Sequence, residues 1–195
     1  MRRTMILFLV ATPWLVSCGR DNSSDSILAE PQSRQGRGAT IRLESAAFKE
    51  GGTIPKVHTC DGRGTSPPLE WSRVPEAARS LSLIVEDPDA PGGTFTHWVL
   101  FDLPPDLKGL SEGIPREGEV KLTPGGATAR QGKNDFGKLG YGGPCPPGST
   151  HRYIFLLYAL DDGPHLKPGA TREELLRGLK GHILAEGRLM GRYTR

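Results

Sequence analysis

The 195-residue chain has few cysteines and aromatic residues: three Cys, three Trp and 7% Phe, Trp and Tyr together. It has no cluster of lysines and arginines, so the sequence gives no electrostatic support for binding nucleic acid. Basic and acidic residues are nearly balanced, 25 against 22. If Arg2 and Arg3 were removed with a cleaved leader, the count would become 23 against 22, a net charge of about +1.

Glycine and proline, by contrast, are abundant, with 26 and 17 residues. Together they make up about a fifth of the chain, which is typical of a loop-rich β protein and below the range of disordered chains. The length fits one domain with tails. No internal repeat is present.

No apolar run is long enough to cross a bilayer as a helix. The longest, Met5–Val16, follows two arginines and precedes Ser17 and Cys18. A basic start, an apolar core and small residues at its end predict a secretory signal peptide at residues 1–17. The sequence Leu-Val-Ser-Cys that ends at Cys18 resembles the bacterial lipobox, which implies cleavage before Cys18 and lipid on its thiol. An ordinary signal peptide with a coincidental cysteine is the alternative.

Residues 18–38 have almost no apolar content, which predicts a solvated tether between the lipid and a folded domain at residues 39–195. More than one acyl chain makes such an anchor durable. We therefore expect a protein of the bacterial cell envelope that is held to the membrane through Cys18. Gly19 favours the outer membrane, facing the periplasm, if the cell has two membranes.

Lipidation of Cys18 would leave Cys60 and Cys145 in an oxidising compartment. An even number of remaining cysteines favours a disulfide between them. Two separate buried thiols are the alternative.

Short apolar or alternating runs predict a series of strands. They lie at residues 40–44, 69–71, 80–86, 97–102, 119–123, 152–160 and 186–193. Thr171 and Glu174 have the spacing of a helix capping box, and three leucines at helical spacing follow. Ile183 and Leu184 are interpreted as a continuation of this helix past a break.

Residues 125–148 are rich in glycine, and almost no regular structure is expected there. A loop of this length in a compact domain is usually functional. The predicted fold class is mainly β, an antiparallel β-sandwich with a short C-terminal helix and long Gly/Pro-rich loops.

Residues 87–98 carry the first group of candidate site residues. Asp87 and Asp89 lie in a proline-stiffened loop after a strong strand, and His97 and Trp98 begin the next strand. The second group is His151-Arg-Tyr153, whose alternation places His151 and Tyr153 on one sheet face. We expect the two groups to meet in one small site, although each residue alone has an ordinary structural explanation as a turn former or a core polar group.

Two other kinds of site receive little support. The histidines and carboxylates lack the close spacing of metal ligands, so no metal or cofactor is predicted. Cys60 and Cys145 as nucleophiles conflict with an exported location. No Gly-x-Ser-x-Gly elbow is present, so a serine hydrolase is only a minor alternative.

The motifs resemble the phosphatidylethanolamine-binding protein family, and more closely its bacterial Raf-kinase-inhibitor-like branch. The stretches that carry the resemblance span the domain: Ser66-Pro-Pro-Leu-Glu-Trp71, Asp87-Pro-Asp-Ala-Pro91, His97-Trp98, Asn134-Asp-Phe-Gly137, Gly143-Pro-Cys-Pro-Pro147 and His151-Arg-Tyr153. The resemblance implies a sandwich of antiparallel sheets and a small pocket for phosphate or phospholipid head groups.

It also implies roles for individual residues. Asp87, His97, His151 and Tyr153 would line the pocket, and Pro91, Trp98, Cys145 and Pro146 would shape its wall and rim. A disulfide between Cys60 and Cys145 would then join two pocket loops.

The expected function is therefore that of an exported, lipid-anchored binding protein without catalysis. Its expected ligand is a small anion or a phospholipid head group. The alternative is a protein-interaction module that inhibits an envelope protease or a signalling partner, and the sequence does not name that partner.

Overall fold

The computed structural model describes residues 39–122 and 126–195. The predicted signal peptide, the tether and Cys18 lie outside the described residues. The described part contains ten strands, one 3₁₀ turn (Lys56–His58) and one helix, α1 (Arg172–Leu179). The strands are β1 (Ala39–Thr40), β2 (Arg42–Glu44), β3 (Leu69–Ser72), β4 (Ser80–Asp87), β5 (Phe95–Leu103), β6 (Gly109–Leu110), β7 (Glu119–Leu122), β8 (Ala127–Gln131), β9 (Thr150–Leu160) and β10 (Ile183–Thr194).

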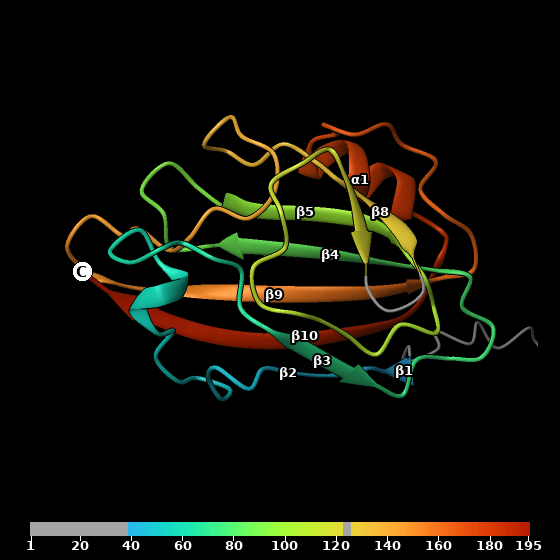
Figure 1. Ribbon diagram of the computed structural model, residues 1–195, viewed down its shortest axis with the longest axis horizontal. Helices are drawn as coiled ribbons and strands as arrows, with labels where there is room; N and C mark the ends of the chain where they lie inside the picture. Colours follow the sequence, from blue (N-terminus) through green and yellow to red (C-terminus); the bar gives the residue numbers. More distant parts are fainter. Residues whose placement is uncertain (1–38, 123–125) are drawn as a thin grey trace, which may run out of the picture. The chain divides into compact units, whose positions relative to one another are not determined.

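The strands form two sheets, which Figure 1 shows with β4, β5, β9 and β10 side by side. The larger sheet has the order β1-β10-β9-β4-β5-β8-β7, and the smaller sheet has the order β2-β3-β6. All pairings are antiparallel except that of β1 with β10. The predicted fold class, mainly β with two antiparallel sheets and one short C-terminal helix, is confirmed.

The central strands are buried on both faces of the large sheet, which explains why their sequences are nearly continuous apolar runs. One face of β4 and its neighbours packs against the small sheet in a core that includes Leu83, Leu100, Leu157 and Trp71. The other face packs against α1 in a second cluster, made of Ile84, Val99, Phe101, Tyr158, Leu160, Ala170, Leu175 and Leu179.

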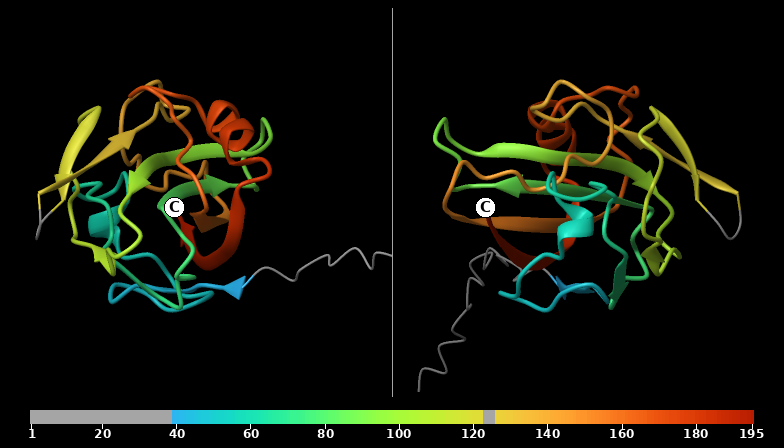
Figure 2. Two further views of the ribbon diagram at one scale, coloured as in Figure 1. Left: turned by 90° about the vertical axis from the view of Figure 1, so that its right-hand side faces the viewer. Right: turned by 60° about the vertical axis from the view of Figure 1, so that its left-hand side comes forward.

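Helix α1 covers the second face because its sequence fixes both its start and its position (Figure 2). Thr171 and Glu174 form the predicted capping box, which satisfies two backbone donors at the helix start. Arg172 then forms a largely buried ion pair with Glu86 of β4 at 2.7 Å. Within the described residues no helix is long and apolar enough to cross a membrane.

Two sequence-based predictions of local structure were wrong. Strand β8 lies inside residues 125–148, because Ala127–Gln131 pairs with both β7 and β5 in spite of its polar composition. Ile183 and Leu184 begin β10 and do not extend the helix, which ends where the backbone of Lys180 turns to an extended conformation. In both cases pairing with a neighbouring strand outweighs local preference.

Candidate functional site

The structure brings the four predicted pocket-lining residues together at one end of the large sheet. Asp87 ends β4, His97 lies in β5, and His151 and Tyr153 lie in β9. All four are buried, with exposed fractions of 4%, 3%, 4% and 1% in that order. We call Asp87, His97, His151 and Tyr153 the polar cluster.

A β-bulge places His97 in this cluster. Trp98 pairs with Val85, whereas Thr96 pairs with Glu86, so His97 is an extra residue in β5. In such a bulge two residues of one strand lie opposite a single residue of its partner strand, and the extra residue changes the direction of a side chain. His97 and Trp98 therefore both lie over the Val85 face, and the His97 ring meets the Tyr153 ring edge-on at 5.1 Å.

Asp87 and His151 form a buried hydrogen-bonded pair. The Nδ1–H group of His151 donates to Asp87 Oδ2 at 2.7 Å, and the backbone N–H of Asp89 donates to Asp87 Oδ1 at 2.8 Å. These donors offset the cost of burying the carboxylate. On the other side of the ring, His151 Nε2 lies 3.0 Å from the hydroxyl of Ser149.

His97 is held as a neutral imidazole. Its Nδ1–H donates to the carbonyl of Gly142 at 2.7 Å. Burial lowers the pKa of His97 below its ordinary value, while the Gly142 carbonyl and the charge of Asp87 partly oppose this shift. Phe136 packs on the ring at a centroid distance of 5.4 Å.

The hydroxyl of Tyr153 is buried and makes no hydrogen bond of good geometry with any described residue. Burial, then the charge of Asp87 and a contact of its carboxylate with the hydroxyl, raises the pKa of Tyr153 far above its ordinary value, so the hydroxyl keeps its proton. An unpaired buried donor costs about 1–3 kcal/mol. A ligand oxygen would remove this cost.

Asp89 fixes the loop after β4 against β9. Its carboxylate accepts hydrogen bonds from the guanidinium and the backbone N–H of Arg152 at 2.6, 2.8 and 2.9 Å. These bonds lower the pKa of Asp89 to about 2. The sequence alone favoured a turn-forming role for Asp89, and its contacts in the structure are with Arg152.

The predicted wall and rim residues have different surroundings. Trp98 is fully buried, and its Nε1–H donates to Gln131 at 2.7 Å. Its indole N–H is therefore already satisfied, and the ring meets the Tyr141 ring edge-on at 5.5 Å. Pro91 is exposed in the loop after β4, whereas Pro146 is buried. The backbone of Cys145 lies close enough to the Tyr153 hydroxyl to affect its pKa.

A disulfide joins Cys60 and Cys145, with their Cα atoms 5.4 Å apart, which confirms the predicted pairing. The two loops also touch through their backbones: Cys60 N–H donates to the Pro144 carbonyl at 3.0 Å. Gly143 permits this approach, because a Cβ atom there would lie 2.7 Å from the His58 carbonyl oxygen. The disulfide therefore connects the loop beside Tyr153 to a loop distant in sequence.

Sequence reasoning missed Ser149 and Phe136. Ser149 lies two residues before His151, so the alternation that paired His151 with Tyr153 also indicates Ser149. Phe136 lies in the Gly-rich stretch, whose sequence carries no signal for contact with His97.

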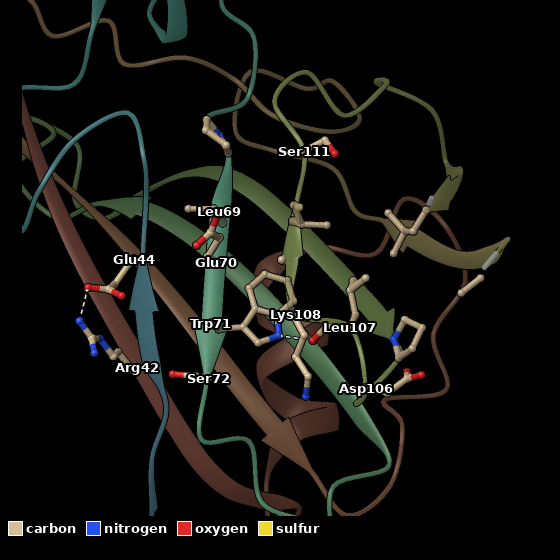
Figure 3. Close-up of a pocket in the computed structure, with 16 residues that line it drawn as sticks. Arg42, Glu44, Leu69, Glu70, Trp71, Ser72, Asp106, Leu107, Lys108 and Ser111 are labelled. Atoms are coloured by element: carbon tan, nitrogen blue, oxygen red, sulfur yellow. Dashed lines mark hydrogen bonds and ion pairs between the residues drawn. The ribbon is translucent and has the colours of Figure 1, made fainter. Parts of the chain in front are cut away.

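A larger surface groove lies elsewhere among the described residues. It has a volume of 810 Å³ and follows β3 and β6 beside Trp71 and Lys108 (Figure 3). None of the polar cluster lines it. A hollow of 500 Å³ adjoins the cluster at Ser149 and His151. Within the described residues, no three His, Cys, Asp or Glu side chains gather as metal ligands.

Comparison with known proteins assigns the family. The family model "Phosphatidylethanolamine-binding protein" matches residues 44–194. The chain is 50% identical over 155 residues to a UPF0098 protein of Methanothermobacter thermautotrophicus, covering 80% of this chain and 99% of the relative. A UPF0098 protein of Aquifex aeolicus is 46% identical over 161 residues, covering 81% of this chain and 91% of the relative.

Solved structures agree. A putative phosphatidylethanolamine-binding protein homologue of Chlamydia trachomatis superposes with a TM-score of 0.71 at 42% identity, and YbcL of E. coli with 0.72 at 32%. Each match covers 80% of this chain and 99% of the other. The chain belongs to the phosphatidylethanolamine-binding protein family.

Reduction of the disulfide should lower the free energy of unfolding by about 4 kcal/mol, because the cross-link closes a long loop in the unfolded chain. Cys60 and Cys145 are 85 positions apart. Urea unfolding with and without reductant measures the change. The double variant Cys60→Ala/Cys145→Ala is the control, and its midpoint should not respond to reductant. An equal response in both proteins would contradict the assignment.

Proposed function

We propose that this protein is an exported, lipid-anchored binding protein that takes a small phosphoryl group or phospholipid head group at the polar cluster. The observation that carries the proposal is the unpaired, buried hydroxyl of Tyr153 beside His97 and the Asp87–His151 pair. The family's name refers to a phospholipid, and the chemistry of the cluster supports a ligand of that class.

The cluster offers the donors that a phosphoryl group needs. The neutral phenol of Tyr153 donates one hydrogen bond, and a protonated imidazole donates a stronger, charge-assisted one. In the structure the Ser149 hydroxyl lies 3.0 Å from His151 Nε2, at the place where a ligand oxygen would bind. Asp87 orients His151 through their 2.7 Å hydrogen bond. Binding therefore requires Ser149 to move aside.

The chain of contacts from Asp87 through His151 to Ser149 has the order of a serine-hydrolase triad. We nevertheless propose binding without catalysis. Ser149 is followed directly by β9, whereas a nucleophile elbow places its serine between a strand and a helix. A serine hydrolase also needs preorganised hydrogen-bond donors that point at the oxyanion of the reaction intermediate. Stabilisation of this oxyanion is usually the largest single contribution to the rate of catalysis.

Replacing His151 tests the site. His151→Asn keeps an amide donor for Asp87 and avoids leaving a buried carboxylate unpaired. It removes Nε2, so the affinity for glycerophosphoethanolamine should fall by about tenfold or more, with little change in melting temperature. Isothermal calorimetry measures the affinity.

The matched control is His182→Asn. His182 also donates through Nδ1 to a carboxylate, Asp161, at 2.8 Å, but this pair is exposed and lies in a different part of the fold. The control should bind as the unaltered protein does. Unchanged affinity in His151→Asn would refute the proposed site.

The pH dependence of binding tests the role of His97. In the free protein its pKa is lowered, so the ring is neutral at pH 7; a bound anion stabilises the imidazolium and raises that pKa. By linkage, affinity should rise as the pH falls from about 8 toward 5, by at most tenfold per pH unit for one proton.

Glycerophosphoethanolamine suits this titration because its phosphodiester and amine do not change charge in that range. Calorimetry in two buffers with different ionisation enthalpies should show proton uptake on binding, and His97→Gln should reduce it. Affinity that stays constant or falls toward low pH would contradict the proposed role.

The lipid anchor at Cys18 is part of the same proposal and is supported by the lipobox-like sequence and by a disulfide suited to an oxidising compartment. In bacteria that express the full chain, the protein should take up radioactive palmitate and sediment with membranes. Cys18→Ser should abolish both properties, whereas Cys60→Ser should keep the label. Labelling that survives Cys18→Ser would contradict the anchor.

A further inference from the structure

A second cavity lies beside the disulfide and is separate from the polar cluster. It is open to solvent, its volume is 280 Å³, and it is lined by residues of the loop 59–64, by Arg116 and by residues of the segment 134–145. We call it the basic cavity, because Arg63, Arg116 and Lys138 line it and no carboxylate does. None of the polar cluster lines it. Gly142, Gly143 and Cys145 do, and they form the wall between the basic cavity and the polar cluster, because the Gly142 carbonyl also accepts from His97.

Two of the three cations are available to a ligand. Arg63 is paired with Glu112 at 3.2 Å. Arg116 and Lys138, in contrast, form no ion pair with any described residue. One N–H of Arg116 donates to the Gly64 carbonyl at 2.6 Å, which holds the guanidinium at the cavity and leaves its other N–H groups to donate. The cavity therefore presents a fixed positive charge.

Neighbouring carboxylates are engaged elsewhere. Asp61 accepts from the Tyr193 hydroxyl at 2.7 Å and pairs with Arg195 at 3.1 Å. Asp135 accepts from the backbone N–H of Thr96 at 2.6 Å. Both side chains are outside the lining, so they do not occupy the place of an anionic ligand.

An exposed aromatic side chain lines the same cavity. Phe136 is 43% exposed and is one of two large apolar side chains that are exposed among the described residues. Its edge contacts with Phe95 and His97, at 4.8 and 5.4 Å, hold the ring in place. A positioned aromatic ring beside two cations matches a ligand with an anionic end and an apolar body.

From this combination we propose that the basic cavity binds a small phosphate monoester with a planar or apolar body. The phosphate contacts Arg116 and Lys138, and the body packs on Phe136. The volume is near the lower limit of small-molecule sites, which fits a ligand of one ring. The Gly142–Cys145 wall separates this ligand from the one proposed for the polar cluster, so both can be bound together.

Amide NMR titration of the purified protein with phenyl phosphate tests the proposal. The amides of Gly64 and Phe136 should shift, and in Arg116→Gln/Lys138→Gln the affinity reported there should fall by about tenfold or more. Arg79→Gln/Lys121→Gln removes the same charges from exposed positions outside the cavity and should have no effect. Inorganic phosphate should bind the cavity more weakly, because it lacks the body that packs on Phe136.

Two outcomes would overturn the proposal: no shift at Gly64 and Phe136 up to about 10 mM phenyl phosphate, or shifts that persist in Arg116→Gln/Lys138→Gln. Vesicles of phosphatidic acid that shift these amides where phenyl phosphate does not would also overturn it, assigning the cavity to a lipid head group.

The proposals for the two sites can be refuted independently of each other. In His151→Asn the cavity response should remain, while the amides of Asp89 and of residue 151, which respond to glycerophosphoethanolamine in the unaltered protein, should no longer do so. Loss of the cavity response in His151→Asn would mean that Gly64 and Phe136 report only on the polar cluster, which would refute a second site.

Discussion

The buried contact between Asp87 and His151 is the interaction on which the site depends. A carboxylate with 4% exposure is stable only if donors surround it, and here the donors are an imidazole of β9 and the backbone of the loop after β4. The contact therefore requires the end of β4 and the start of β9 to lie side by side in the sheet. It also fixes His151 in the tautomer with its proton on Nδ1, which leaves Nε2 facing Ser149.

The other half of the polar cluster depends on one irregularity in the sheet. Regular alternation would send His97 to the face opposite Trp98, toward helix α1. The bulge in β5 turns it instead toward Tyr153, and the Gly142 carbonyl then fixes its tautomer. The bulge thus brings His97 into the polar cluster, from which a regular strand would keep it away. Bulges are enriched beside functional sites.

Most of the fold could be predicted from the sequence, because its long strands and its helix carry local signals. The continuous apolar run of β4, the apolar run of β9 and the capping box at Thr171 each specify an element without tertiary information. Strand β8 carries no such signal. Its residues are Ala-Thr-Ala-Arg-Gln, and it is a strand because β5 and β7 lie on either side of it.

The site was predictable to a different degree. Alternation alone paired His151 with Tyr153, and the stiff loop between two strands made Asp87 and His97 candidates. The resemblance to a family then implied that all four line one pocket. Neither source indicates a bulge, because one extra residue in a strand leaves no pattern that a period of two would reveal. The contact of Phe136 with His97 is equally hidden, since it depends on how the Gly-rich segment folds back over β5.

The disulfide connects these features to the proposed cellular location. The segment from Gly142 to Cys145 has little regular structure, yet it supplies the His97 partner on one side and the wall of the basic cavity on the other. Backbone hydrogen bonds join this segment to His97 and Cys60, and the bond from Cys145 to Cys60 adds a covalent link. Because Cys60 is exposed, reducing agents can reach this bond, and an oxidising compartment favours its persistence. The proposed export to an oxidising compartment would keep this bond intact, and it would give the predicted N-terminal leader and the loop cysteines one common explanation.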